Sequence, residues 1–218
     1  MKGKYDFCTM QILLVAATAN EIELFINSYP NIDILVTGVG VPATMYQLQK
    51  RLHAEEYDFV IQAGIAGSFT DEIELGETVL VKQDTFGDLG IEEKHNFTPI
   101  TNSGLVNGHD FPYADGWLMN MAGIPKQSIL KAVKSVTVNK VTDAIVQKQQ
   151  LITAYDPQIE TMEGAALHYV CLQEEIPFVQ IRSISNYVGE RDKRKWKMKE
   201  AFENLNTELK TLINQLTD

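Results

Sequence analysis

Short apolar runs alternate with helical patterns along the whole chain. The runs that predict β-strands are Gln11–Ala17, Ile32–Thr37, Phe59–Ala63, Glu77–Val81, Ser135–Val138 and Phe178–Ile184. The patterns that predict helices are Asn20–Ser28, Pro42–Glu55, Asp143–Ala154, Glu163–Glu175 and Lys193–Leu216. Several strand runs are apolar without alternation, as expected when helices cover both faces of a sheet. This order predicts βα units around a mainly parallel or mixed sheet, in one α/β domain over residues 1–218.

Residues at the predicted boundaries are typical of turns and caps. Pro42 suits the first turn of a helix, where its missing N–H costs nothing. Thr142 or Asp143 is expected to cap the helix that follows, and Asp156-Pro157 to mark the turn after it.

The segment Asp84–Lys126 breaks the alternation, because seven glycines and prolines lie from Gly87 to Gly116 alone. It predicts irregular structure, and loops of that length are usually functional or disordered. Its aromatic residues argue against disorder: Phe86, Phe97, Phe111, Tyr113 and Trp117. We expect a partly ordered loop system over a substrate or a subunit contact.

Charge and cysteine content narrow the function classes. The formal net charge is −10, from 19 basic and 29 acidic side chains, so a nucleic-acid backbone would be repelled. The basic run Lys193–Lys199 has glutamates close behind it, which favours the solvated start of a helix. Cys8 and Cys171 are the two cysteines, and their different contexts favour reduced thiols over a disulfide or a metal site.

The N-terminal apolar run has two interpretations. Basic residues precede it and Ala17-Thr18-Ala19 imitates a signal-peptidase site. The run is short, however, and continues directly into a helical pattern, so a buried first strand is favoured over an export signal. No stretch approaches the roughly 20 apolar residues of a membrane span. These observations predict a cytoplasmic protein.

Glycine-rich or acidic segments follow several predicted strands, where α/β sheets place their ligands. Thr18–Glu23 carries Glu21, which can accept a proton from water or simply favour the first turn of a helix. Thr37–Ala43 matches the dinucleotide pattern G-x-G-x-x-A, but the next strand ends in Gln62-Ala63-Gly64 without the acidic residue that such a site needs.

Two later segments likewise allow a functional and a structural interpretation. Gln62–Ser68 allows a flat group to lie against the backbone, or forms a tight strand-to-helix turn. Ile159–Ala166 carries Glu163, whose buried carboxylate needs polar partners such as ribose hydroxyls or a structural arginine. The histidines show no metal-ligand spacing, and no Ser-His-Asp arrangement or phosphate loop is present.

Taken in order, these segments resemble the purine-nucleoside phosphorylase and nucleosidase superfamily. The residues that carry the resemblance are Ala17–Glu21, Gly38–Gly40, Ala63–Gly67, Met162–Glu163 and Arg182–Asn186. Phe86–Gly90 and Ser185–Asp192 are similar to the futalosine hydrolases in particular. The resemblance implies a phosphorylase/hydrolase-like fold, a three-layer sandwich with a central twisted mixed β-sheet flanked by helices, which assembles as a homo-oligomer (dimer or higher).

The resemblance also implies a role for each matching position. Glu21 orients and deprotonates the attacking water, Glu163 binds the ribose hydroxyls, and Asn186 recognises the base. The expected substrate-binding positions beside these catalytic residues are Gly64, Ile65, Ala66, Gly67 and Met162. No metal and no organic cofactor is implied, and the partner is a small-molecule purine nucleoside.

Departures from the superfamily pattern narrow the reaction. Nucleosidases for adenine nucleosides carry an aspartate at the position of Asn186, and a neutral amide favours a 6-oxopurine such as hypoxanthine. Gln62 and Ile65 replace the phosphate-holding residues of the phosphorylases, although Ser68 remains nearby. The prediction is therefore hydrolysis of futalosine to hypoxanthine and dehypoxanthine futalosine, in menaquinone biosynthesis.

Other functions stay open. They are a 5′-methylthioadenosine/S-adenosylhomocysteine-type nucleosidase, a phosphate-dependent purine nucleoside phosphorylase, a noncatalytic nucleoside-binding protein and, more distantly, a nicotinamide oxidoreductase. The region 84–117 is expected to shape the pocket on the 5′ side of the substrate.

Overall fold

The computed structural model describes residues 10–26, 28–29, 32–94, 96–121 and 130–217. All the predicted strands are present, with edges shifted by a few residues. Their bounds are β1 Ile12–Ala16, β2 Asp33–Val36, β3 Phe59–Ser68, β4 Thr78–Asp84, β9 Lys131–Thr137 and β11 Phe178–Tyr187. Cys8, His95 and the end of the predicted irregular segment, 122–126, lie outside the described residues.

The strands form a nine-stranded mixed sheet in the order β2-β1-β3-β10-β9-β4-β8-β7, and β11 pairs with both β3 and β4. The strand β10 spans Ile159–Thr161. Because β3 pairs β10, β10 pairs β9, β9 pairs β4 and β11 joins β4 back to β3, these strands close into a ring. A cluster of buried side chains includes Ala66, Ile159 and Ile184 from three strands of this ring.

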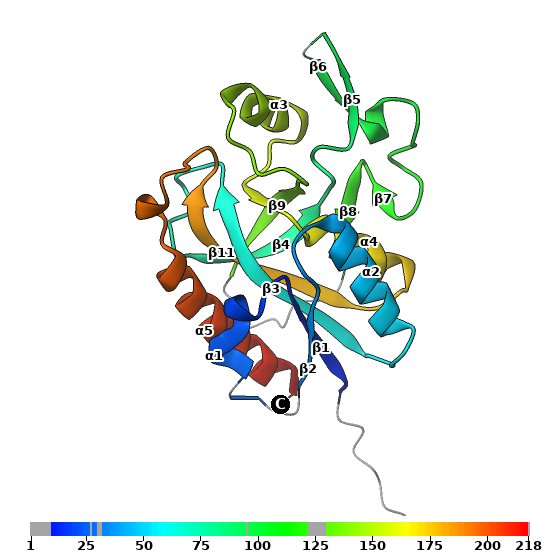
Figure 1. The fold of residues 1–218 in the computed structure, drawn as a ribbon. Coiled ribbons are helices and arrows are strands. Elements are labelled where there is room, and N and C mark those ends of the chain that lie inside the picture. Colours follow the sequence, from blue (N-terminus) through cyan, green and yellow to red (C-terminus); the bar gives the residue numbers. More distant parts are fainter. Residues whose placement is uncertain (1–9, 27, 30–31, 95, 122–129, 218) are drawn as a thin grey trace, which may run out of the picture.

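Helices cover both faces of the sheet, as predicted (Figure 1). Successive residues of a strand point to opposite faces, so Leu13 and Leu14 of β1 enter different cores. Leu14 packs with Leu205 of α5 Met198–Thr217. Leu13 packs with the residues of α2 Val41–Leu52 and α4 Gly164–Gln173. The three-layer sandwich with a central mixed sheet is confirmed.

Two predicted helices are shorter or broken. The pattern at 20–28 forms a 3-10 turn, Ala19–Ile22, followed by α1 Glu23–Ile26. The C-terminal pattern begins with a separate 3-10 turn, Lys193–Lys195, before α5.

The helix cap predicted at Thr142 or Asp143 is wrong. Ala144 holds the cap position of α3 Ile145–Tyr155 and offers no side-chain hydrogen bond. The backbone N–H of Thr142 instead donates to the carboxylate of Glu160 in β10 at 3.0 Å, so the segment before α3 is tied to the sheet.

The segment after β4 is more regular than predicted. It contains the hairpin β5 Gly90–Glu93 with β6 Asn96–Pro99, a 3-10 turn Ile100–Asn102, and the hairpin β7 Tyr113–Ala114 with β8 Trp117–Met119. The prediction of a partly ordered loop system agrees with the irregular residues between these elements, but the hairpins were missed because their strands are two to four residues long, too short for a period to be visible. The strand β10 was missed for the same reason.

A buried carboxylate ties the end of β4 to the start of α4. Asp84 Oδ1 accepts hydrogen bonds from the Thr85 N–H at 2.8 Å and the Thr137 hydroxyl at 2.9 Å. Thr137 Oγ1 in turn accepts from the Ala165 N–H at 2.7 Å. Burial raises the pKa of Asp84 to about 7, against the opposing effects of its hydrogen bonds and the Arg182 charge.

The raised pKa of Asp84 gives a pH dependence of stability. Between the unfolded pKa of about 4 and the folded value, the native state holds a proton that the unfolded state has lost, so stability falls as pH rises. We expect Asp84→Asn to flatten this fall between roughly pH 5 and pH 8, measured as the free energy of urea unfolding. Equal pH slopes for the variant and the wild type would contradict the assignment.

Candidate active site

Glu21 is held rigidly at the carboxyl end of β1. Its Oε2 accepts from the Thr18 N–H at 2.9 Å and from the Thr18 hydroxyl at 3.2 Å. Its Oε1 accepts from the Ile65 N–H at 3.2 Å. Glu21 therefore also has the structural role that the sequence allowed, because its side chain caps the helical turn in which it lies. That capping fixes the position of the Glu21 carboxylate, with Oε1 beside the Ile65 N–H.

Glu163 precedes α4 but does not cap it. The first N–H groups of α4 donate elsewhere: Gly164 to Thr161 Oγ1 at 3.3 Å, and Ala165 to Thr137. The carboxylate of Glu163 is thereby left for other partners, and its Oε1 accepts from the Gly40 N–H at 3.0 Å. Burial raises the pKa of Glu163, and the Arg182 charge opposes that shift.

Arg182 lies beside these carboxylates and is 1% exposed. Its Nη1 is 3.6 Å from Glu163 Oε2, and its Nη2 donates to Gln62 Oε1 at 2.7 Å. A Cβ on Gly64 would lie 3.0 Å from Glu21 Oε1 and would collide with Arg182 Nη1. Gly64 therefore provides the space in which Glu21, Arg182 and Glu163 converge.

The predicted base-recognition residue lies further along the same strands. Asn186 is opposite Gly67, and a Cβ on that glycine would lie 3.3 Å from Asn186 Nδ2. Asn186 Oδ1 accepts from the Ser185 hydroxyl at 2.8 Å, and Nδ2 donates to the Tyr187 carbonyl at 3.0 Å. An amide nitrogen carries two N–H donors, so one of them is not used by the Tyr187 carbonyl, and the Val188 side chain also lies close to Gly67.

The other predicted positions contribute unequally. Gly64–Gly67 lie inside β3, so the alternative of a strand-to-helix turn is wrong. Ile65 contributes its backbone N–H to Glu21, and the half-buried Met162 directly precedes Glu163. The side chain of Ala66 packs into the core cluster with Ile159, so only the backbone of Ala66 could contact a substrate.

The sequence offers a structural arginine as one possible partner of Glu163, and Arg182 is that arginine. Its identity and its proximity to Glu21 were not predicted. That proximity depends on the pairing of Arg182 with Gly64 across β11 and β3. Glu160, which is buried two residues before Met162, was missed, although a carboxylate in an apolar strand is itself a signal.

His168 is buried, and its Nδ1 lies 2.9 Å from the Leu118 carbonyl oxygen. Burial lowers the pKa of His168 to about 4. Among the described residues, no group of three or more His, Cys, Asp or Glu side chains could hold a metal ion. No helix in the described part of the chain is long and apolar enough to cross a membrane.

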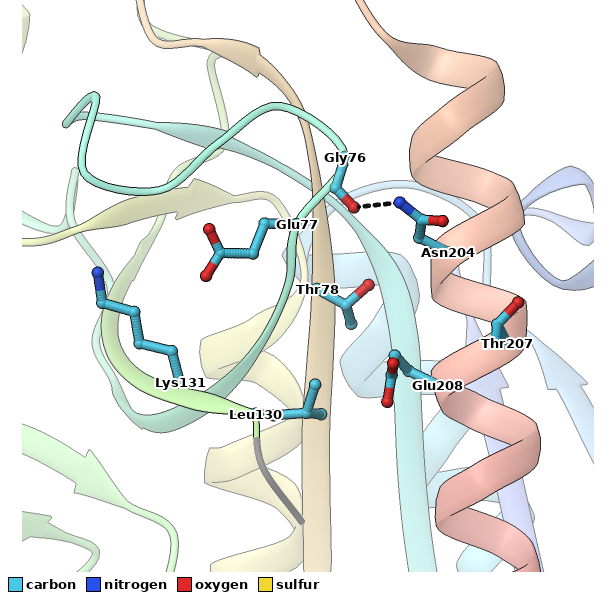
Figure 2. A pocket seen from close by; sticks show the side chains of 8 residues that line it. All are labelled: Gly76, Glu77, Thr78, Leu130, Lys131, Asn204, Thr207 and Glu208. Atoms are coloured by element: carbon cyan, nitrogen blue, oxygen red, sulfur yellow. Dashed lines mark hydrogen bonds between the residues drawn. The ribbon is translucent and has the colours of Figure 1, made fainter.

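A separate hollow of about 300 Å³ lies between the start of β4 and α5 (Figure 2). It is lined by Gly76–Thr78, Leu130–Lys131 and the α5 residues Asn204, Thr207 and Glu208, and Asn204 Nδ2 donates to the Gly76 carbonyl at 2.8 Å. None of the predicted site residues lines it.

A family model described as the phosphorylase superfamily matches residues 15–217. The chain belongs to the phosphorylase superfamily. Within it, the chain is 28% identical over 184 residues to a futalosine hydrolase of Thermus thermophilus, covering 82% of this chain and 80% of that protein.

Other members of the phosphorylase superfamily are also similar. The 5′-methylthioadenosine/S-adenosylhomocysteine nucleosidase of Shewanella sediminis is 25% identical over 185 residues, covering 78% of this chain and 76% of that protein. The native structure of a futalosine hydrolase of Helicobacter pylori superposes with a TM-score of 0.78 at 16% identity, over 95% of this chain and 98% of that chain. This superposition shows a shared fold.

The space above Gly64 gives a direct test of the site. Gly64→Ala would push the guanidinium of Arg182 off Glu163, and we expect catalytic turnover to fall by roughly 100-fold or more. Gly76→Ala is the control, since its positive φ and the contact of its Cβ with the Glu200 side chain cost stability away from Glu21, Arg182 and Glu163. Measured turnover that falls equally in both variants would contradict the assignment.

Proposed function

We propose that the chain hydrolyses the N-glycosidic bond of futalosine and releases hypoxanthine and dehypoxanthine futalosine. The observation that carries this proposal is the convergence of Glu21, Arg182 and Glu163 above Gly64. The relatives named futalosine hydrolase support the substrate, and the menaquinone pathway follows from that substrate.

The buried carboxylates suit cleavage of a ribosyl bond. The C1′–N9 bond breaks with its electron pair leaving on the purine, and the sugar develops positive charge that nearby carboxylates stabilise. Water adds its oxygen to C1′ and passes a proton to Glu21 Oε1, which is already oriented by the Ile65 N–H. The departing base takes up a proton from solvent and Glu21 returns its proton to solvent, so that one water is consumed for each bond cleaved. Glu163 accepts hydrogen bonds from the ribose hydroxyls.

Charge in the site favours water over phosphate. The guanidinium of Arg182 is shared between the Glu163 carboxylate and Gln62 Oε1. With Glu21 alongside, the cluster holds two carboxylates against one cation, so a phosphate dianion would meet net negative charge. This balance supports hydrolysis, in line with the replacement of phosphate-holding residues by Gln62 and Ile65.

The base specificity rests on Asn186. Its free N–H can donate to N7 or to a 6-oxo group but cannot protonate N7 as an acid can. A 5′-methylthioadenosine/S-adenosylhomocysteine-type activity is the second candidate, because similar proteins carry that name.

A homo-oligomer and a cytoplasmic location remain predictions. Phe111 and Met121 are 65% and 80% exposed around an apolar hollow beside α4, which supports a subunit contact in this region.

Glu21→Gln tests the general base. The amide keeps the shape of the side chain but cannot take the proton, and we expect hypoxanthine release from futalosine to fall by roughly 10²–10⁴-fold. Glu23→Gln, at an exposed position two residues along, is the matched control and should retain activity. Wild-type turnover in folded Glu21→Gln would remove Glu21 from the chemistry.

Asn186→Asp tests the base preference. An acid at this position can protonate N7 of adenine, so the ratio of kcat/KM for methylthioadenosine over futalosine should rise about tenfold or more. Chromatography of the released bases gives both values. An unchanged ratio would mean that Asn186 does not select the base.

A further inference from the structure

Three buried polar side chains that the mechanism does not use meet beneath the start of α4. They are Asp84 of β4, Gln180 of β11 and His168 of α4 itself. A Cβ on Gly164 would collide with both Asp84 Oδ2 and Gln180 Nε2, so these two side chains fill the space that the glycine leaves. Glu163 directly precedes Gly164, and the contacts that seat the glycine therefore also hold Glu163 in place.

The three side chains share a set of atoms without partners. Among the described residues, Asp84 Oδ2, both amide atoms of Gln180 and His168 Nε2 complete no hydrogen bond. A buried polar atom that stays unpaired costs free energy. Because the four atoms belong to neighbouring side chains, they can satisfy one another, provided that each proton lies on the right atom.

The backbone contact of His168 settles where its own proton lies. Its Nδ1 is 2.9 Å from the Leu118 carbonyl oxygen, and a carbonyl only accepts, so Nδ1 carries the proton. Burial lowers the pKa of His168, while the Leu118 carbonyl and the Gln180 amide oppose that shift. The ring is therefore neutral at pH 7, and its Nε2 is an acceptor that needs an N–H. The amide of Gln180 can supply it.

The orientation of the Gln180 amide then decides the state of Asp84. In the structure Nε2 lies on the Asp84 side, which leaves Oε1 for the unprotonated Nε2 of His168, so that two acceptors meet. A half-turn of the amide exchanges its two ends and lets Gln180 donate to His168. Oε1 then faces Asp84 Oδ2, and this contact is favourable only if Oδ2 carries a proton, since an ionised carboxylate only accepts.

The surroundings of Asp84 agree with a protonated Oδ2. Burial raises its pKa to about 7, while the hydroxyls of Thr137 and Ser135 and the charge of Arg182 lower it. The groups that face Asp84 are thus the β9 hydroxyls, Arg182 from β11 and, through Gln180, the titratable His168 from α4. Below pH 7 the acid form prevails, and its proton is available to Gln180.

We propose that Gln180 is a positioning residue of the active site, which accepts a hydrogen bond from the protonated Oδ2 of Asp84 and donates one to Nε2 of His168. This inference rests on the proposed function. The chain of bonds keeps Asp84 uncharged. An ionised Asp84 would attract Arg182 in competition with Glu163, so the neutral chain leaves the guanidinium paired with Glu163. Gln180 thus acts through its neighbours and not on the substrate.

The hydrogen bond itself is tested on His168, without substrate. The ¹⁵N shifts of labelled histidine side chains at pH 6 show which ring nitrogen is protonated, and His168→Gln identifies the signal. We expect the proton on Nδ1 and none on Nε2. Gln180→Leu removes the donor and should move the Nε2 signal, whereas Gln49→Leu, at an exposed position of α2, should leave it in place. A proton on Nε2, or a signal that Gln180→Leu does not move, overturns the proposal.

The positioning role is tested by the kinetics of base release from futalosine. Gln180→Leu should lower kcat about tenfold and change KM less than about twofold, because the substrate is not its partner. Gln49→Leu should retain both values. Wild-type kcat should fall above about pH 7 as Asp84 ionises, whereas Asp84→Asn, whose amide still donates to Gln180, should keep its activity there.

The outcomes separate this inference from the function on which it rests. Wild-type protein that releases no base overturns the proposed function alone, since the His168 signals are read without turnover. Folded Gln180→Leu that keeps wild-type kcat, or that raises only KM, overturns the positioning role. Asp84→Asn that loses activity above pH 7 in parallel with the wild type overturns it as well, and this comparison holds even if Gln180→Leu does not fold.

Discussion

The contact on which the site depends is the buried pairing of Arg182 with Glu163, beside Glu21. An arginine that is 1% exposed is costly to bury unless its charge is matched. Here the Glu163 carboxylate balances the charge, and the side-chain oxygen of Gln62 accepts a hydrogen bond from Nη2. The same pairing prevents the carboxylates from repelling one another at close range. The pairing also neutralises the positive charge of Arg182, which a bound phosphate would need. One buried cation thus accounts for the stability of the site, for its preference for water and for the need for glycine at position 64.

The sheet explains how segments far apart in the chain meet there. Closure of β3, β10, β9, β4 and β11 into a ring brings Glu160, Gly67 and Asn186 into one row. The Asp84–Thr137–Ala165 chain of hydrogen bonds caps α4 from the neighbouring strands. Because that chain caps the helix, the carboxylate of Glu163 is free to bind Gly40 and Arg182. The Asp84–Thr137–Ala165 hydrogen bonds and the position of Glu163 thus depend on each other at the start of α4.

Much of this could be predicted from the sequence, and the exceptions have physical causes. Long apolar runs such as the one at Phe178 specify their strands, since both faces are covered. The placing of Glu21 and Glu163 followed from motif order, but their convergence on Arg182 depends on strand register, which no local pattern encodes. The three-residue strand containing Glu160 is too short to show a period. The cap of α3 was mispredicted because Thr142 donates its backbone N–H to Glu160 of β10 and makes no capping contact with α3.

The most direct test of the account is chromatographic detection of free base after wild-type protein is incubated with futalosine, with and without phosphate. The account predicts hypoxanthine release at the same rate in both conditions, with little adenine release from methylthioadenosine. Release that requires phosphate would contradict the assignment of water as the nucleophile, and the absence of any base release would contradict the catalytic interpretation of the Glu21, Arg182 and Glu163 cluster.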